Sequence, residues 1–174
     1  MDAEDSWHIL FVKTGEEERV CTFLNQEKIN CFIPKKEIMY RKNGQSEVLL
    51  QPMFPGHLFI TSALPQRQFC TVIHQLRSRK RGIVRELFYD DEVTSALTPS
   101  EQNMLEQLLN QDKVLIASRG IIENDRVIIL AGPLKGYESR IVHINRHKRQ
   151  ALLELNLCVR TVQVSVALEI IKKI

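Results

Sequence analysis

The 174-residue sequence has no apolar run near the roughly 20 residues that a helix needs to cross a lipid bilayer. It begins with the acidic stretch Met1-Asp2-Ala3-Glu4-Asp5, whereas a secretory signal needs positive charge followed by an apolar segment. These two absences argue against a membrane or secreted protein and predict a cytoplasmic one.

Cysteine is scarce, with four residues at widely spaced positions and no C-x-x-C pair. They are Cys21, Cys31, Cys70 and Cys158. This spacing provides neither a disulfide framework nor a zinc site, so we expect free or buried thiols.

Motifs for catalysis are also missing. The segment "GPLKG" is not a P-loop, because Gly136 is followed by Tyr137 and not by Lys-Ser or Lys-Thr. His143 and His147 stand four residues apart but lack the glutamate of H-E-x-x-H, and strand alternation would place both on one surface. There is no G-x-S-x-G segment. We therefore expect no enzyme, no metal and no cofactor.

Acidic residues are absent between Val48 and Arg85, a stretch that holds six Lys and Arg residues from Arg67 onward. Charge runs are usually solvated surfaces, and cations at a helix C-terminus are favourable by about 0.3–1 kcal/mol each. That explanation accounts for one or two of these cations. It does not account for the five that lie at Arg77, Arg79, Lys80, Arg81 and Arg85.

The residues that are present describe a globular protein, with 44% hydrophobic and 26% charged residues. Charge is divided unevenly. Residues 1–110 hold 13 Lys and Arg against 15 Asp and Glu, a net charge of −2, and residues 111–174 hold 11 against 6, a net charge of +5. This asymmetry indicates two domains with different partners.

Local patterns predict an α+β fold for the first part. Apolar runs at 7–14 and 57–62 predict strands, and Asn43-Gly44 predicts a hairpin turn. Helical spacing of apolar residues predicts helices over about 16–28, 65–77 and 98–111, the last capped by Thr98 with Pro99 in its first turn. We expect a strand from "IVRELFY" and an α/β sandwich with helices on a mostly antiparallel sheet. Trp7, which begins a buried strand, is predicted to lie in the core.

The second part predicts a small barrel. After 111–122, which we predict to be a linker with an optional short strand at Val114–Ile116, four short β-type runs follow at roughly ten-residue spacing. The predicted domains are therefore 1–110, a linker at 111–122, and 123–174.

Two segments resemble one family. "VIILAGPLKGYESRIVHINRHKRQALLEL" is similar to the KOW motif, and "WHILFVKTGEEERV" with "QPMFPGHLFI" resembles the two hallmark stretches of the NusG N-terminal domain. The resemblance covers Trp7 to Lys172 and implies a NusG-type domain followed by an SH3-like KOW barrel. "LCVR" and Ser139 depart from the usual KOW pattern, and "RSRKRG" replaces a shorter Pro-Gly segment. The chain thus looks more like a specialised paralog of the LoaP or RfaH kind.

The resemblance implies a function and two sites. A transcription elongation or antitermination factor would grip the clamp helices of RNA polymerase through Phe11, Phe54, Pro55, His57 and Phe59. A turn would expose Phe54 and His57, whereas Phe11 and Phe59 could equally belong to an ordinary core. The five cations between Arg77 and Arg85 would bind an RNA element of the nascent transcript, for which a hairpin is the expected form. Contact with upstream DNA is another explanation for the same run.

Other assignments stay open. A second basic site is expected at Arg146, Lys148 and Arg149, and the barrel would bind a ribosomal protein or a termination factor. One RfaH-like relative folds its KOW segment as a helical hairpin. In this chain the β-branched residues of the predicted barrel favour strands over that helical form. A KOW protein that binds ribosomal RNA, or a general NusG-like factor without specific RNA recognition, are the alternatives. We expect a monomer.

Overall fold

The computed structural model describes residues 5–89 and 91–174. The described part has a mixed α/β fold, with three α-helices and twelve strands in three sheets. It divides into two compact units, which are described separately. Unit 1 takes residues 5–34, 54–103 and 157–159, and unit 2 takes 35–53, 104–156 and 160–174.

Unit 1 is built on a four-stranded sheet in the order β2-β5-β1-β6, in which the neighbouring strands run antiparallel. Its elements are β1 (Ser6–Val12), α1 (Glu17–Gln26), β2 (Cys31–Phe32), β5 (His57–Ser62), α2 (Gln66–Arg79) and β6 (Ile83–Glu86). The antiparallel sheet is as the sequence predicts, although β6 ends at Glu86 and is shorter than "IVRELFY".

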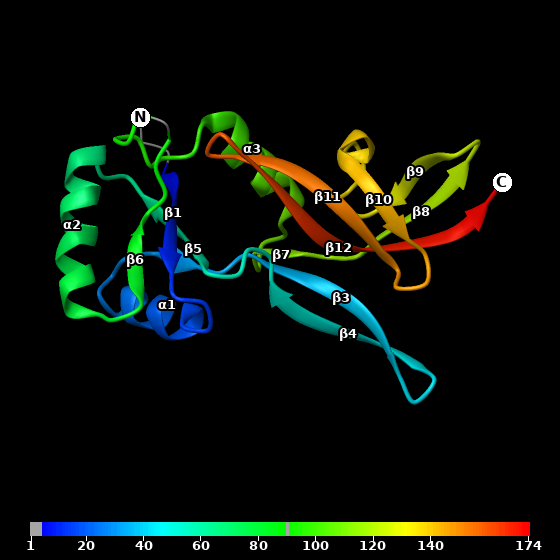
Figure 1. The fold of residues 1–174 in the computed structure, drawn as a ribbon, viewed down its shortest axis with the longest axis horizontal. Helices are drawn as coiled ribbons and strands as arrows, with labels where there is room; N and C mark the ends of the chain where they lie inside the picture. The colour runs from blue at the N-terminus through cyan, green and yellow to red at the C-terminus, as the bar shows by residue number, and fades with distance from the viewer. Residues whose placement is uncertain (1–4, 90) are drawn as a thin grey trace. The chain divides into compact units, whose positions relative to one another are not determined.

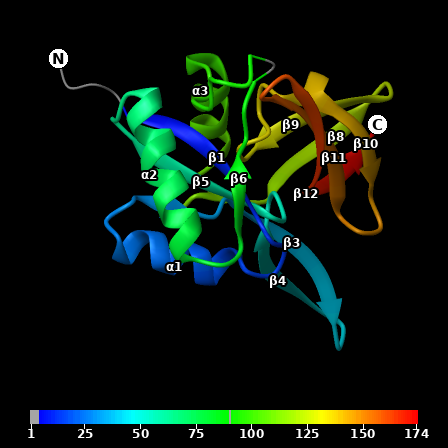
Figure 2. The ribbon, with the colours of Figure 1, turned by 60° about the vertical axis from the view of Figure 1, so that its left-hand side comes forward.

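One side of this sheet carries α1 and α2, as Figures 1 and 2 show. Strand alternation places Leu10 of β1 on that side together with Leu58 of β5. These residues form one apolar cluster with Leu24 of α1 and with Phe69 and Ile73 of α2. The helical spacing read from the sequence therefore marks the packed surface of each helix.

Helix α3 (Pro99–Leu108) begins with a capping box. The Glu101 N–H donates to Thr98 Oγ1 at 3.3 Å, and the Thr98 N–H donates to a Glu101 carboxylate oxygen at 2.9 Å. Thr98 is thus the N-cap and Pro99 the first helical residue, as the sequence predicts.

Unit 2 contains a long hairpin and a five-stranded sheet. The hairpin joins β3 (Lys35–Lys42) to β4 (Gln45–Pro52) through Asn43 and Gly44, whose φ angles are 51° and 78°. Positive φ at both residues fits the turn predicted from the Asn-Gly pair. Strand β4 forms an edge of the sheet β4-β3-β7, where β7 is Val114–Leu115. In Figure 1 the hairpin is the cyan ribbon.

The five-stranded sheet has the order β10-β11-β12-β8-β9. Its strands are β8 (Ser118–Glu123), β9 (Arg126–Ala131), β10 (Ile141–Asn145), β11 (Gln150–Leu157) and β12 (Arg160–Lys173). The last strand lies at the centre of the sheet and pairs with β8 in parallel. Parallel pairing joins residues that are about 50 positions apart in the sequence, so no local turn signal predicts it.

Gly132 follows β9 and has a φ of +102°. A side chain there would place its Cβ 2.5 Å from Ser118 Oγ and 2.6 Å from Ser118 Cα. Gly136, by contrast, has a φ of +89° and open space around it. The first glycine of "GPLKG" therefore serves close packing as well as backbone conformation, and the second serves conformation only.

The predicted linker, 111–122, contains β7 and most of β8. The optional strand proposed at Val114–Ile116 is present as β7, whereas β8 was not predicted. The described strand pairings give a linear order with β9 and β10 at its ends. The barrel and the domain boundaries stay predictions. Within residues 5–89 and 91–174, no helix is both long and apolar enough to cross a membrane.

Candidate functional site

Phe11, His57 and Arg85 form a row across the sheet of unit 1. Phe11 of β1 lies opposite His57 of β5 and opposite Arg85 of β6, so the three side chains share one side of the sheet. The Phe11 and His57 rings meet edge to face with centroids 5.2 Å apart. Phe11 is 37% exposed, which is unusual for a phenylalanine in a strand otherwise buried at most positions. We name these three residues the aromatic row.

Phe54 and Phe59 lie in the core instead. The prediction that the turn exposes Phe54 is wrong, because its ring is 8% exposed and lies 5.7 Å from the ring of Phe59. Phe59 is fully buried and also contacts Trp7, with ring centroids 6.3 Å apart. Trp7 is buried as predicted. Of the five residues predicted to bind polymerase, only Phe11, Pro55 and His57 reach the surface.

The turn between Phe54 and His57 is fixed by the carboxylate of Glu17. The N–H groups of Gly56 and Gly15 each donate to this carboxylate at 2.7 Å. Burial by itself raises the pKa of Glu17. The hydrogen bonds that its carboxylate accepts from backbone N–H groups outweigh burial and hold the pKa below its ordinary value. The Glu17 carboxylate is therefore charged and joins the start of α1 to the turn that carries His57.

The same turn disfavours a larger residue at Gly56, through its backbone conformation and through close neighbours. Its φ is +76°, and a Cβ would lie 3.2 Å from Thr14 Oγ1 and 3.3 Å from the Val12 carbonyl oxygen. Pro55 completes the turn, because its carbonyl accepts a hydrogen bond from His57 Nδ1 at 2.8 Å. The His57 ring is thereby oriented from two sides, by this bond and by Phe11.

Sequence reasoning missed Glu17. The acidic run Glu16–Glu18 fits the dipole of α1, which explains an acidic first turn but distinguishes none of the three residues. The signal that marks Glu17 is a contact with Gly56, 39 residues away. The antiparallel pairing of β1 with β5 brings the two residues together, and the local sequence does not indicate that pairing.

The basic run at the end of α2 is not uniform. Arg79 donates twice to the Glu27 carboxylate at 2.9 Å and lies over the ring of Phe23. Lys80 lies over the same ring, 5.6 Å from its centroid. These two cations already have partners in α1 and its C-terminal turn. Their first effect is to hold α1 and α2 together.

Arg77 and Arg81 differ from them. Both are exposed, and among the described residues neither has a carboxylate within 4.0 Å. Arg85 lies apart on β6, in the aromatic row. The five predicted RNA-binding residues therefore fall into three groups. Arg77 and Arg81 have no carboxylate partner, and Arg79 and Lys80 contact α1 and its C-terminal turn. Arg85 belongs to the aromatic row.

The second basic site surrounds the turn between β10 and β11. Arg149 donates to Ser46 Oγ at 2.9 Å and lies 3.9 Å from the Glu169 carboxylate. Arg146 and Lys148 are exposed, and in the described part of the chain neither has a carboxylate within 4.0 Å. The turn that presents them is fixed by Asn145, whose side-chain oxygen accepts from the Lys148 N–H at 3.0 Å.

Metal ligands do not gather anywhere in residues 5–89 and 91–174, where no group of three or more His, Cys, Asp and Glu could hold an ion. None of the four cysteines is in a disulfide bond. His143 is in β10, but His147 lies beyond the end of that strand, so the prediction that strand alternation aligns them is wrong.

Comparison with known proteins gives one family. The model of the NusG family, described as "Transcription termination factor nusG", matches residues 5–109, which is more than half of the chain. The chain belongs to the NusG family. The match includes the aromatic row, the Glu17 contact and the basic run of α2, so these features lie within the NusG region.

A solved structure described as "Domain interaction in Thermotoga maritima NusG" is also similar. It is 12% identical, covers 96% of each chain and has a TM-score of 0.46. The assignment to the NusG family rests on the family model, which matches residues 5–109.

Proposed function

We propose that this NusG-family protein is a transcription elongation or antitermination factor that binds the clamp helices of RNA polymerase. The observation that carries the proposal is the aromatic row. An apolar ring exposed beside an oriented imidazole, on a rigid sheet, is the kind of surface that receives a partner helix. The Glu17 contact fixes the adjacent turn before binding, which lowers the entropy lost on association.

The basic run supports a second part of the proposal, namely recognition of an RNA element in the nascent transcript. Arg77 and Arg81 are available for this contact, because among the described residues neither has a carboxylate within 4.0 Å. Arg79 and Lys80, by contrast, already have partners in unit 1. Arginine suits RNA because its planar fork binds phosphate and its flat surface stacks on bases. A hairpin is the expected form of the element.

The remaining parts of the proposal concern the region beyond residue 110. We assign it a KOW-type barrel that binds a ribosomal protein or a termination factor, and a place among the specialised paralogs of the family. The second candidate function is a general NusG-type factor without specific RNA recognition. Its support is the ion pair of Arg79, which gives part of the basic run a structural role. A ribosomal-RNA-binding KOW protein is disfavoured, because such a protein does not need the aromatic row.

Replacing Phe11 with alanine should weaken binding to the polymerase clamp helices about tenfold, since truncation of a central aromatic anchor commonly costs more than 1 kcal/mol. The measurement is affinity for purified RNA polymerase, with folding checked by circular dichroism. Leu64→Ala is the matched control, because Leu64 is similarly exposed, at 40%, but lies in a loop outside the row. Equal affinity of the Phe11 variant and the wild type would refute the polymerase assignment.

The double variant Arg77→Gln, Arg81→Gln should lose preference for a hairpin over unstructured RNA. Binding would be measured against a panel of hairpins at several salt concentrations. Arg126→Gln with Lys135→Gln removes the same charge from exposed positions elsewhere and is the control. If both double variants weaken all RNAs equally, the contact is nonspecific and the general NusG-type function is correct.

A further inference from the structure

Strand β4 of the long hairpin has an open edge. It is the last strand of the sheet β4-β3-β7, and its eight residues pair with β3 without a register shift. Among the described residues, no backbone hydrogen bond joins Ser46–Leu50 to a segment other than β3. Every second residue of an antiparallel strand directs its N–H and C=O away from the partner strand. The edge of β4 therefore presents donors and acceptors that can pair with another strand.

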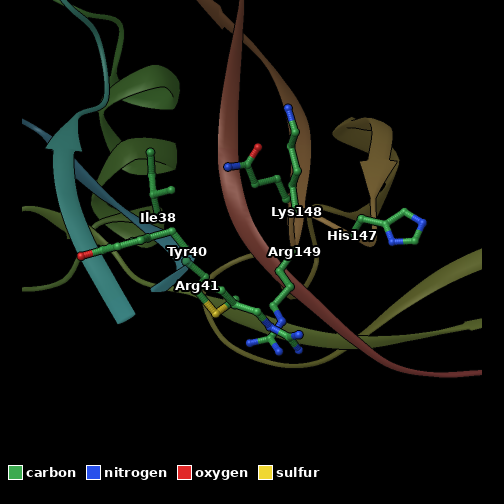
Figure 3. Close-up of a pocket in the computed structure, with 8 residues that line it drawn as sticks. Ile38, Tyr40, Arg41, His147, Lys148 and Arg149 are labelled. Carbon is green, nitrogen blue, oxygen red and sulfur yellow. The ribbon is translucent and has the colours of Figure 1, made fainter. Parts of the chain in front are cut away.

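The opposite edge of the hairpin already has neighbours. Lys35 and Lys36 of β3 pair with β7. Beyond them, Ile38–Arg41 line a cleft of about 340 Å³ whose other wall is His147–Gln150, as Figure 3 shows. The edge that is open to an additional strand is therefore the edge of β4.

This edge lacks the features that usually protect one, which are lysine, a proline within the strand, or a bulge. β4 contains no Lys or Arg, although β3 beside it has four. Its one proline, Pro52, is the last residue of the strand. The centre of the strand is apolar instead, because Val48, Leu49 and Leu50 are 57%, 48% and 49% exposed. Three consecutive large apolar side chains on an unpaired edge indicate an interaction surface.

The apolar residues of β4 lie on both sides of the hairpin. Val48 is opposite Met39 on one side, and Leu49 is opposite Ile38 on the other. A strand that covers this edge has to offer apolar residues on both of its own sides. β4 itself has this pattern.

A second copy of β4 matches the first in one antiparallel register. With Leu49 opposite its own copy, Val48 lies opposite Leu50, so each apolar residue meets an apolar residue. In the same register Glu47, the one charged residue of the strand, lies opposite the neutral amide of Gln51. A pair centred on Val48 would instead place Leu49 opposite Glu47. A pair centred on Leu50 would place Leu49 opposite Gln51.

We propose that the chain forms a two-fold dimer by antiparallel pairing of β4 with β4 of a second copy, in the register centred on Leu49. The two hairpins then form one continuous sheet with a β7 strand at each end. Both copies use the same edge, so the assembly closes at two chains. A ladder this short buries less area than a standard interface, and we therefore expect a reversible dimer. This differs from the monomer expected from the sequence, in which the edge position of β4 has no signal.

Sedimentation velocity of the full chain at increasing protein concentration measures the dimer. Leu49→Lys places two like charges opposite one another at the centre of the ladder and should weaken dimerisation by about tenfold or more. Leu130→Lys is the matched control, because Leu130 is 47% exposed and lies on β9, the last strand of the other sheet of unit 2. It should leave dimerisation unchanged.

Cysteine cross-linking tests the register. Leu49→Cys should form an intermolecular disulfide in oxidised glutathione, since directly opposite residues have Cα atoms about 4.5–5.5 Å apart. Val48→Cys should not, because its two copies would be diagonal neighbours roughly 7–8 Å apart. A mixture of Val48→Cys and Leu50→Cys should cross-link, because those two positions are opposite. The wild type, with its four cysteines, gives the background.

Three results would overturn the proposal. One is a protein that stays monomeric at every concentration, whichever other partner the edge then has. Another is an equal loss of dimer in Leu49→Lys and Leu130→Lys, which would show general hydrophobic association. The third is equal cross-linking of Leu49→Cys and Val48→Cys, which would exclude the register. Thermal melting of each variant shows whether a lost dimer reflects lost folding. None of these measurements involves polymerase or RNA, so they test the dimer independently of the proposed function.

Discussion

Replacing Glu17 with alanine should lower the free energy of unfolding by about 3 kcal/mol. Two hydrogen bonds from Gly15 and Gly56 end on this buried carboxylate, and hydrogen bonds to charged groups contribute roughly 1.5–3 kcal/mol each. The variant leaves the buried Gly56 N–H without its acceptor. The measurement is denaturant unfolding at neutral pH. Polymerase affinity should fall as well, because the turn that carries His57 loses its support.

Two comparison variants sharpen this result. Glu18→Ala changes an exposed residue of the same helical turn and should cost much less. Glu17→Gln keeps the shape but has only one oxygen to accept, so an intermediate loss is expected. If Glu17→Ala and Glu18→Ala unfold at the same denaturant concentration, the contact with Gly56 does not stabilise the fold.

The Glu17 contact also predicts a pH dependence. Its folded pKa lies below its ordinary value, so the unfolded chain takes up the proton first as pH falls. The stabilisation is therefore fully present above the ordinary glutamate pKa and is lost as pH falls through the folded pKa. The difference in unfolding free energy between the wild type and Glu17→Gln should shrink over that acidic range.

The free energy of unfolding should fall by about 3 kcal/mol between pH 7 and pH 4 because of the buried residue His8. Burial lowers the pKa of His8 from 6.5 to about 4, and each unit corresponds to about 1.4 kcal/mol. The ring is 2% exposed and is stacked on Phe69 with centroids 3.8 Å apart. Its Nδ1 shares a hydrogen bond of 2.8 Å with Ser95 Oγ, and Nε2 has no partner within the described residues.

The direction of this effect follows from proton uptake. Below pH 6.5 the unfolded chain protonates His8 while the folded protein keeps it neutral, so stability falls until about pH 4 and is constant below. His8→Phe keeps the stacked ring and removes the titrating group. Carboxylates titrate in both proteins, so the difference between the two unfolding curves isolates His8. A difference that does not vary from pH 7 to pH 4 would contradict the prediction.

Features with a local cause could be predicted from the sequence. The Asn43-Gly44 turn, the Thr98 cap and the apolar stripes of the helices each depend on residues a few positions apart. The burial of Trp7 follows from its place in an apolar strand. These elements, with the resemblance of two segments to the NusG family, were enough to predict a mixed α/β fold.

Features that depend on distant pairing could not be predicted. The sequence shows Phe54 next to Pro55-Gly56 and predicts exposure, but the ring packs against Phe59 across the turn. The carboxylate of Glu17 looks like its neighbours until β1 and β5 pair. The hydrogen bond from Arg149 to Ser46 joins residues 103 positions apart, so neither segment carries a signal of the other.

The central place of β12 in its sheet has a consequence for synthesis on the ribosome. The sheet of unit 1 has its last strand at Glu86, so its strands can pair while the rest of the chain is still being translated. The sheet β10-β11-β12-β8-β9 has to wait until the residues of β12 have left the exit tunnel, because β8 pairs with them. The aromatic row should therefore form before the five-stranded sheet of unit 2. Until β12 emerges, β8 and β11 have unpaired edges, and at this stage the nascent protein is most exposed to misfolding.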